Sequence, residues 1–252
     1  MKLLFLDIET SPIQAYMWGL FNQNISVDQV ITPHSILCWA AKWHGAKEII
    51  YESAGGALRG APFNAMIRKM HTLLSEADAV CHYNGASFDL PRLNTEFLRL
   101  GMAPPPPVPS IDLLQVVRHK FGMTSNKLAF VGPALGVGEK VKHAGWALWE
   151  GCLKKDQDSW RLMERYNKQD VELLERLYRK VLPWIDQHPN ENVFNPRPDG
   201  VAVCPNCGGA SLQKRGTYKT VTQEYVRYAC TRCGRWSRAR KAEKPKRAVE
   251  VR

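Results

Sequence analysis

The sequence predicts an α/β domain with a mixed β-sheet flanked by helices, followed by a small cysteine-rich domain. Three observations lead to this prediction. Strand-like apolar runs come first, helical and strand-like segments then alternate, and two CxxC pairs lie near the C-terminus. With 252 residues, 44% of them hydrophobic, the chain can bury a substantial core in one large or two unequal domains.

The first strands are indicated by apolar runs separated by turn residues. Residues 2–8 (KLLFLDI) are typical of a central strand that is buried on both faces. Residues 35–44 and 47–52 flank the turn-forming Gly45, which predicts two further strands and an antiparallel meander. A fourth strand is predicted over 78–83.

Helices are indicated where apolar residues recur at helical spacing. The pattern predicts helices over 62–77, 88–100, 112–121, 127–135 and 158–185. The proline-rich segment 104–109 predicts a stiff loop, and residues 136–153 stay mostly unassigned. A dinucleotide-binding Rossmann fold is excluded because no GxGxxG follows the first strand.

The positive charge is concentrated at the C-terminal end. Residues 201–252 carry 13 lysines and arginines against 3 acids, whereas the first 200 residues carry 22 against 21. This concentration favours a polyanionic partner, most often nucleic acid, and a solvated basic tail is the alternative. We therefore expect a domain over 1–185, a linker over 186–200, a cysteine-rich domain over 201–240 and a basic tail over 241–252.

The localisation is indicated by what the sequence lacks. No apolar run approaches the roughly 18 residues of a membrane helix, and the first residues show no signal-peptide pattern. The odd number of cysteines, 7, argues against a secreted disulfide framework. We expect a soluble, cytoplasmic protein without a membrane partner.

Acidic residues recur at positions where a carboxylate is unusual. Asp7 and Glu9 lie two residues apart at the end of the first strand, so both carboxylates face the same side. Tyr166 and Asp170 share one face of the last helix, and Asp170 lies on its apolar stripe, where a carboxylate needs a partner or a metal ion. Alternatively, Asp170 is a boundary acid bonded to an arginine or an amide.

Asp89 supplies a third acidic element. It follows the strand over 78–83 and the turn Asn84-Gly-Ala-Ser-Phe, where it could project from a helix start towards the end of the first strand. The alternative is an ordinary acid in a first helical turn, which the helix dipole favours.

Together these residues resemble the DEDD 3′-to-5′ exonucleases, which have a ribonuclease H-like fold. Asp7-Ile-Glu9-Thr10 is similar to the first family motif and the segment from Asn84 to Asp89 to the second. Tyr166-x-x-x-Asp170 is similar to the third motif in the tyrosine (DEDDy) subclass. The resemblance covers roughly residues 1–185 and implies a ribonuclease H-like exonuclease domain.

The resemblance also implies a role for each residue. Asp7, Glu9, Asp89 and Asp170 would hold two Mg²⁺ or Mn²⁺ ions, with Asp7 shared between them, and Tyr166 would orient the attacking water. Two such ions, about 3.5 to 4 Å apart, can stabilise the attacking and leaving oxygens of a phosphodiester. Hard oxygen ligands favour Mg²⁺ or Mn²⁺ over zinc.

The C-terminal cysteines predict a zinc ribbon. Cys204 and Cys207 form one CxxC pair, Cys230 and Cys233 form the other, and a glycine follows each pair. Two matched pairs in tandem predict one structural Zn²⁺, and a redox dithiol is the weaker interpretation. Because so small a segment lacks a core of its own, we expect the ion to hold it folded.

Basic and aromatic residues are interleaved around these cysteines, a combination typical of single-strand binding by phosphate attraction and base stacking. Docking of a protein partner is the alternative, and the sequence identifies no such partner. The predicted contacts to nucleic acid are Lys214, Arg215, Lys219, Arg227, Arg232, Arg235 and Trp236.

The combined prediction is a metal-dependent 3′-to-5′ exonuclease whose zinc ribbon holds the substrate, with single-stranded DNA favoured over RNA. The alternatives are an RNA-directed or structure-specific nuclease and a non-catalytic nucleic-acid adaptor. The segment after the first motif is unusually aromatic, and Trp18 and Phe21 in it either stack on terminal bases or cover the core.

Overall fold

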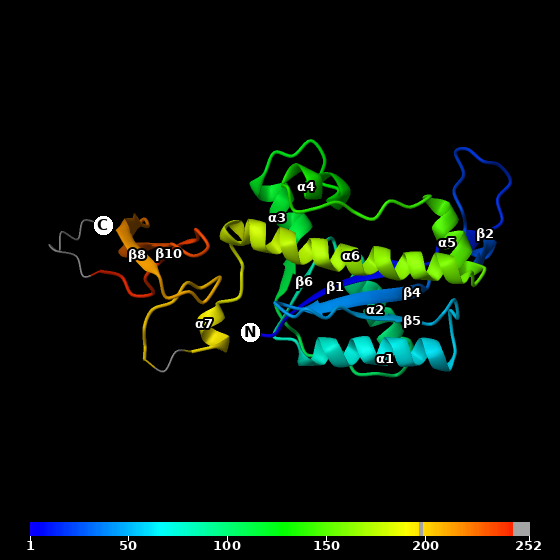
Figure 1. Ribbon diagram of the computed structural model, residues 1–252, viewed down its shortest axis with the longest axis horizontal. Coiled ribbons are helices and arrows are strands. Elements are labelled where there is room, and N and C mark those ends of the chain that lie inside the picture. The colour runs from blue at the N-terminus through cyan, green and yellow to red at the C-terminus, as the bar shows by residue number, and fades with distance from the viewer. Residues whose placement is uncertain (197–198, 244–252) are drawn as a thin grey trace. The chain divides into compact units, whose positions relative to one another are not determined.

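The computed structural model describes residues 1–196 and 199–243 (Figure 1). The chain divides into two compact units, one over residues 2–177 and one that joins Met1 to the chain from Tyr178 onward. The first unit contains the predicted mixed α/β domain. Among the described residues, no helix has the length and apolar character that crossing a membrane requires.

A five-stranded mixed sheet forms the centre of the first unit. Its strands, in spatial order, are β5 (Ile50–Ser53), β4 (Ile36–Trp43), β1 (Leu3–Thr10), β6 (Ala79–His82) and β7 (Ser110–Asp112). Strand β4 runs antiparallel to both β1 and β5, which confirms the predicted meander. Strands β6 and β7 run parallel to β1.

Helices cover both faces of this sheet, and Figure 1 shows α1 and α6 on opposite sides of it. The helices of the unit are α1 (Ala61–Glu76), α2 (Asp89–Arg99), α3 (Leu113–Lys120), α4 (Leu128–Ala134), α5 (Trp146–Leu153) and α6 (Gln157–Val181), the last of which continues into the second unit.

Strand β1 separates two packing environments. Leu4, Leu6 and Ile8 belong to the main core together with apolar residues of α1 such as Met66 and Met70. Because side chains alternate along a strand, Asp7 and Glu9 face the other side of the sheet, where α6 lies. The alternation thus directs the acidic pair away from the main core.

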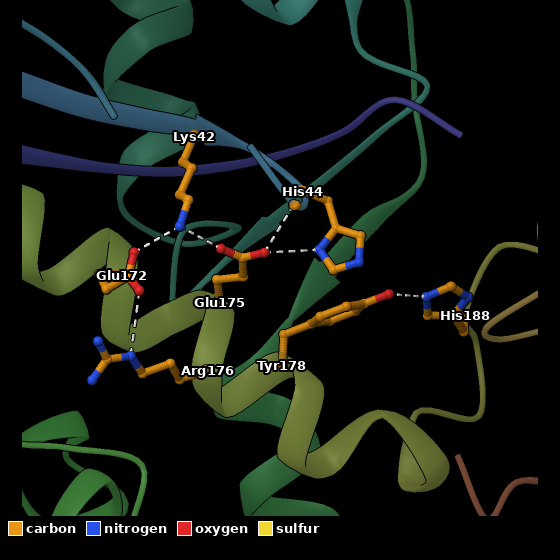
Figure 2. Close-up of polar contacts among 8 residues, drawn as sticks. Lys42, His44, Glu172, Glu175, Arg176, Tyr178 and His188 are labelled. Atoms are coloured by element: carbon orange, nitrogen blue, oxygen red, sulfur yellow. Dashed lines mark hydrogen bonds and ion pairs between the residues drawn. The ribbon is translucent and has the colours of Figure 1, made fainter. Parts of the chain in front are cut away.

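A buried ion-pair network joins α6 to β4 (Figure 2). The Nζ of Lys42 lies 2.6 Å from Glu172 and 2.7 Å from Glu175, and the side chains of Lys42 and Glu175 are 7% and 3% exposed. Glu175 also accepts a hydrogen bond of 2.9 Å from the backbone N–H of Gly45 and lies 3.1 Å from Nδ1 of His44. These contacts fix the position of α6 along β4.

The second unit contains a three-stranded sheet in the order β10 (Trp236–Arg238), β9 (Glu224–Cys230) and β8 (Leu212–Lys219). The cysteine-bearing turns are anchored to the segment that follows α6. Asn206 donates hydrogen bonds to the carbonyls of Leu182 (2.9 Å) and Ile185 (3.2 Å). Arg235 donates to the carbonyl of Pro183 and to Asp186.

Several short elements differ from the predictions. Strand β7 was not predicted and shares only Asp112 with the predicted helix over 112–121, and α5 lies within the stretch left unassigned. A two-stranded ribbon of β2 (Gln14–Ala15) and β3 (Val30–Thr32) was also not predicted. Strands of two or three residues are too short to show a periodic pattern, which explains why sequence patterns missed them.

The remaining elements are short helices, namely the 3₁₀ turns Val27–Gln29 and Leu182–Trp184 and helix α7 (Glu191–Phe194). The last predicted helix therefore ends in a 3₁₀ turn. Of the predicted basic tail, residues 244–252 lie outside the described part of the chain.

Candidate active site

Strand β1 presents Asp7 and Glu9 where one of its edges is open. On the β4 side the pairing continues through Asp7 and Glu9, but on the β6 side it ends at Phe5, opposite Cys81. The carboxyl-terminal half of β1 therefore has no strand partner on that side. Ligand sites in α/β sheets lie at such carboxyl ends.

Asp89 occupies this open edge. It begins α2, is 3% exposed, and its Oδ1 accepts a 3.0 Å hydrogen bond from the backbone N–H of Ile8. Because Ile8 lies between Asp7 and Glu9, this bond places Asp89 beside the acidic pair. The turn that precedes α2 thus connects the second motif to the first.

Helix α6 completes the acidic group. One carboxylate oxygen from each of Asp7, Glu9 and Asp170 lies within 4.8 Å of the other two. The structure brings these three carboxylates together, with Asp89 adjacent through Ile8. Oxygens this close repel one another unless a cation lies among them or some are protonated.

This repulsion, together with burial, raises the pKa values of the four carboxyl groups. Burial, followed by the charge of Asp170, raises the pKa of Glu9 to about 8. The pKa of Asp7 is raised by burial and by the charges of Glu9, Asp89 and Asp170. Burial raises the pKa of Asp89 to about 6 and also raises that of Asp170. The site disfavours negative charge in the absence of a counter-ion.

These carboxylates suit a hard divalent cation. Oδ1 of Asp170 is buried and, among the described residues, has no hydrogen-bond partner, so its lone pairs are available to a ligand. An oxygen-only donor set matches Mg²⁺ or Mn²⁺ better than zinc. The residues present therefore fit the metal ions that sequence reasoning assigned to them.

Lys140 lies in the site, although sequence reasoning did not identify it. Its Nζ donates to Oδ2 of Asp170 at 2.7 Å and to the hydroxyl oxygen of Tyr166 at 2.9 Å. Lys140 belongs to the irregular segment between α4 and α5, where no periodicity signals its position. Its charge offsets part of the acidic cluster and lowers the pKa of Asp170, against the effect of burial.

Tyr166 packs in a cluster of three aromatic rings. Its ring is 8% exposed and meets His143 and Trp149 edge-on, with ring centroids 4.9 Å and 6.0 Å away. Burial raises the pKa of Tyr166, so its hydroxyl stays protonated at neutral pH. His143, which sequence reasoning treated as an ordinary structural or surface histidine, thus packs against a candidate catalytic residue.

A cleft of about 600 Å³ opens beside the acidic group. Asp7 and Asp170 line it together with the basic side chains of Arg118, Lys127 and Lys140. A cleft that combines carboxylates with nearby cations can hold metal ions and a phosphodiester at the same time.

The four predicted zinc ligands also lie together. The thiol sulfurs of Cys204, Cys207, Cys230 and Cys233 all lie within 4.8 Å of one another. The Sγ atoms of Cys204 and Cys233 are 3.6 Å apart, and those of Cys207 and Cys230 are 3.7 Å apart. Zn–S bonds of about 2.3 Å in a tetrahedron require S–S distances of about 3.8 Å. The cluster therefore fits a zinc ribbon.

The predicted nucleic-acid contacts divide into two groups. Six are exposed, namely Lys214, Arg215, Lys219, Arg227, Arg232 and Trp236. Arg235 is different, because its guanidinium is engaged with Pro183 and Asp186. The ribbon also stacks cations on rings, with Arg227 4.8 Å from the ring centroid of Trp236 and Arg238 4.1 Å from that of Tyr225. Tyr225 was not among the predicted contacts.

The segment between β2 and β3 exposes its aromatic side chains. Trp18 is 96% exposed and Phe21 is 82% exposed. The interpretation that they cover the core is therefore wrong.

Comparisons with known proteins agree with this fold. Residues 4–182 match the family RNase_H_2, described as RNase_H superfamily. The fold is similar to part of the family B DNA polymerase from the hyperthermophilic archaeon Pyrobaculum calidifontis, with a TM-score of 0.54 and 18% identity. This match covers 72% of the present chain and 24% of the polymerase chain, and at this identity it shows the fold alone. No curated protein matched significantly.

The family match extends over most of the chain and includes every strand of the five-stranded sheet together with its flanking helices. It also includes Asp7, Glu9, Asp89 and Asp170. The chain therefore belongs to the RNase H superfamily.

Proposed function

We propose that this protein is a two-metal-ion 3′-to-5′ exonuclease that hydrolyses single-stranded nucleic acid, with DNA preferred over RNA. The observation that carries the proposal is the close approach of the Asp7, Glu9 and Asp170 carboxylates, within 4.8 Å of one another. Membership of the RNase H superfamily supports a nuclease. The direction of attack rests on the resemblance to DEDD exonucleases, and the preference for DNA is tested by comparing the two nucleic acids directly.

Each carboxylate has a defined place in the proposed site. Asp7, Glu9, Asp89 and Asp170 would hold two Mg²⁺ or Mn²⁺ ions, which would activate water and stabilise charge on the phosphodiester oxygens. Oδ1 of Asp89 accepts a hydrogen bond from the backbone N–H of Ile8, which holds this carboxylate beside Asp7 and Glu9. Glu9 and Asp170 project from β1 and α6, so the relative position of these two elements sets the spacing of the site.

Tyr166 and Lys140 act on the attacking water. The Tyr166 hydroxyl oxygen accepts a hydrogen bond from Lys140, which leaves the O–H of Tyr166 free to donate to a water molecule and orient it. Lys140 in turn holds Asp170 through its ammonium group. We assign Tyr166 as a catalytic residue and Lys140 as a residue that positions it.

We propose four parts along the chain, namely a ribonuclease H-like domain over 1–185, a linker over 186–200, a zinc ribbon over 201–240 and a basic tail over 241–252. The ribbon and the exposed aromatic segment of the first domain would bind the substrate. The exposed cations of the ribbon would attract phosphates, and Trp236 would stack on a base. Trp18 and Phe21 would stack on bases of the unpaired 3′ end.

The test uses 5′-labelled single-stranded DNA and the matching RNA, with Mg²⁺, Mn²⁺ or EDTA. We expect a ladder that shortens from the 3′ end, requires a divalent ion and favours DNA. Asp7→Ala should abolish cleavage and leave the fold intact, whereas Asp158→Ala, at an exposed acid of α6, should cleave normally. Because EDTA also competes for zinc, the Asp7→Ala comparison in zinc-containing buffer assigns the metal requirement to the acidic site.

Two results would overturn the proposal. Faster loss of RNA than of DNA would indicate the RNA-directed alternative. Binding of both nucleic acids without cleavage under any metal would indicate a non-catalytic adaptor.

A further inference from the structure

Asn167 is a fully buried polar residue at the acidic site, to which sequence reasoning gave no role. It lies on α6 between Tyr166 and Asp170 and is 0% exposed. A buried amide is costly unless its donors and acceptors are satisfied. Its partners are therefore informative about why an amide occupies this position.

Both ends of the Asn167 amide are engaged. Its Nδ2 donates to Oδ2 of Asp7 at 2.7 Å and lies 3.3 Å from the Asp7 backbone carbonyl. Its Oδ1 accepts from the thiol of Cys38, at 3.9 Å from the sulfur. The amide therefore connects α6 to two neighbouring strands, β1 and β4.

When Asp7 is ionised, as a metal ligand must be, this arrangement favours one orientation of the amide. Rotating it by half a turn would place Oδ1 against the Asp7 carboxylate, where two acceptors would repel. Asp7 thus receives a hydrogen bond of defined direction on one carboxylate oxygen. Its other oxygen and the remaining lone pairs stay available to cations.

The chemistry of an amide suits this position. An amide donor orients a carboxylate without adding a positive charge, so it does not replace the charge of a divalent cation. A lysine or arginine at position 167 would neutralise Asp7 and compete with the metal ions. Hydrogen bonds from outer residues to metal-ligating side chains commonly change metal affinity by about 10- to 100-fold.

We propose that Asn167 is a positioning residue that holds the Asp7 carboxylate in the orientation in which it binds divalent cations. The proposal rests on the proposed function, since it assumes that Asp7 is a metal ligand. It assigns to Asn167 no contact with the substrate.

The test compares Mn²⁺ binding by wild type, Asn167→Leu and Cys38→Ala, each as the full, zinc-loaded chain. Binding is measured by electron paramagnetic resonance and cleavage is measured against Mn²⁺ concentration. Asn167→Leu keeps the branched shape of the side chain and removes the donor, whereas Cys38→Ala removes the thiol contact of the same amide and leaves the bond to Asp7 in place. Asn167→Ala is measured in parallel in case the leucine variant does not fold.

We expect the Asn167 variants to bind Mn²⁺ about tenfold more weakly than wild type. Their cleavage rate should partly recover at high Mn²⁺ concentration. Cys38→Ala should bind Mn²⁺ with wild-type affinity. Wild-type affinity in both Asn167 variants, with only a lower Tm, would show that Asn167 merely packs and would overturn the proposal.

Failure of the proposed function gives a different pattern. If wild type binds Mn²⁺ through Asp7 but cleaves nothing, the exonuclease assignment fails and the binding comparison still decides the role of Asn167. If wild type binds no Mn²⁺ at this site, both proposals are overturned.

Discussion

Glu9 shows how a single residue of the acidic site affects stability. Burial and the charge of Asp170 raise its pKa from 4.5 to about 8. The folded state therefore retains a proton that the unfolded state loses above about pH 4.5. The stability that comes from this protonated form is complete below that pH and is lost as the pH rises through 8.

Glu9→Gln should consequently stabilise the zinc-loaded protein when no Mg²⁺ or Mn²⁺ is added. Because the Glu9 side chain keeps partial access to solvent, which weakens the effect, we expect a gain of about 1 to 2 kcal/mol at pH 8 and almost none at pH 4.5. Urea unfolding at the two pH values measures the gain, and adding Mn²⁺ should stabilise wild type more than the variant. An equal gain at both pH values would contradict this account.

At the scale of elements, the Lys42–Glu175 pair decides how α6 packs on β4 (Figure 2). Both side chains are almost fully buried, and Glu172, a second partner of Lys42, is 28% exposed. Removing one partner of a buried pair leaves an uncompensated charge, whereas replacing both by apolar residues is often neutral.

Glu175→Leu should therefore lower the free energy of unfolding by about 3 kcal/mol. The double variant Lys42→Met/Glu175→Leu should recover part of that loss, because the bond from the Gly45 N–H stays broken. Arg176→Ala, which removes an exposed ion pair with Glu172 on the same helix, should cost less than about 1 kcal/mol. Equilibrium urea unfolding of the variants measures these values. A double variant no more stable than the single one would show that packing, and not charge, dominates.

His82 connects β6 to the turn that leads to Asp89. Its Nδ1 accepts the backbone N–H of Gly85 at 3.0 Å, and its Nε2 lies 2.6 Å from the Ser110 hydroxyl. A glycine is required at position 85, because an added Cβ would lie 2.4 Å from the imidazole ring. Since Nδ1 is an acceptor, Nε2 carries the proton, so His82 cannot serve as a base towards Ser110.

The buried, neutral His82 predicts acid sensitivity. Burial lowers its pKa to about 4, so the unfolded state binds more protons between pH 6.5 and 4. Stability from this group is complete above pH 6.5 and should fall by about 2 kcal/mol by pH 5. His82→Gln should be less stable than wild type at pH 7, but its stability should not fall in this way as the pH is lowered. The difference in free energy of unfolding between the two proteins should therefore be smaller at pH 5. An unchanged difference in urea unfolding would contradict the prediction.

At the scale of the whole molecule, the excess of positive charge and the acidic site lie in different parts of the chain. Residues 201–252 carry 13 of the 35 lysines and arginines but only 3 of the 24 acids. The carboxylates that would hold metal ions lie within residues 7–170. Substrate capture and hydrolysis should therefore be separable.

Deleting residues 201–252 should weaken binding of long single strands, reduce the salt dependence of the affinity and spare slow cleavage of short oligonucleotides. Affinity measured against salt concentration tests this. Cys230→Ser disrupts the cysteine cluster and keeps every basic residue, so it distinguishes the contribution of the folded ribbon to affinity from that of its charge. Unchanged affinity in the deletion would reassign the ribbon to a protein partner.

Much of this protein could be predicted from local patterns. The apolar run of β1, the helical stripe of α1 and the position of Asp170 on the apolar face of α6 are all periodic features of neighbouring residues. The spacing of the two CxxC pairs likewise predicts a tetrahedral cluster of four thiolates. Such features can be predicted because they depend only on the spacing of residues that are close together in the sequence, such as the period of a strand or a helix.

Other features depended on contacts between distant parts of the chain. Asn167 bonds to Asp7 across 160 positions, Asp89 bonds to Ile8 across 81, and Lys140 reaches Asp170 from a segment without periodicity. No local pattern encodes these approaches, because they arise when α2, α6 and the segment before α5 pack against the sheet. The sequence by itself determined the α/β class and the candidate carboxylate and thiolate ligands. The tertiary structure decided which groups orient those ligands, since burial and proximity set their hydrogen bonds and their pKa values.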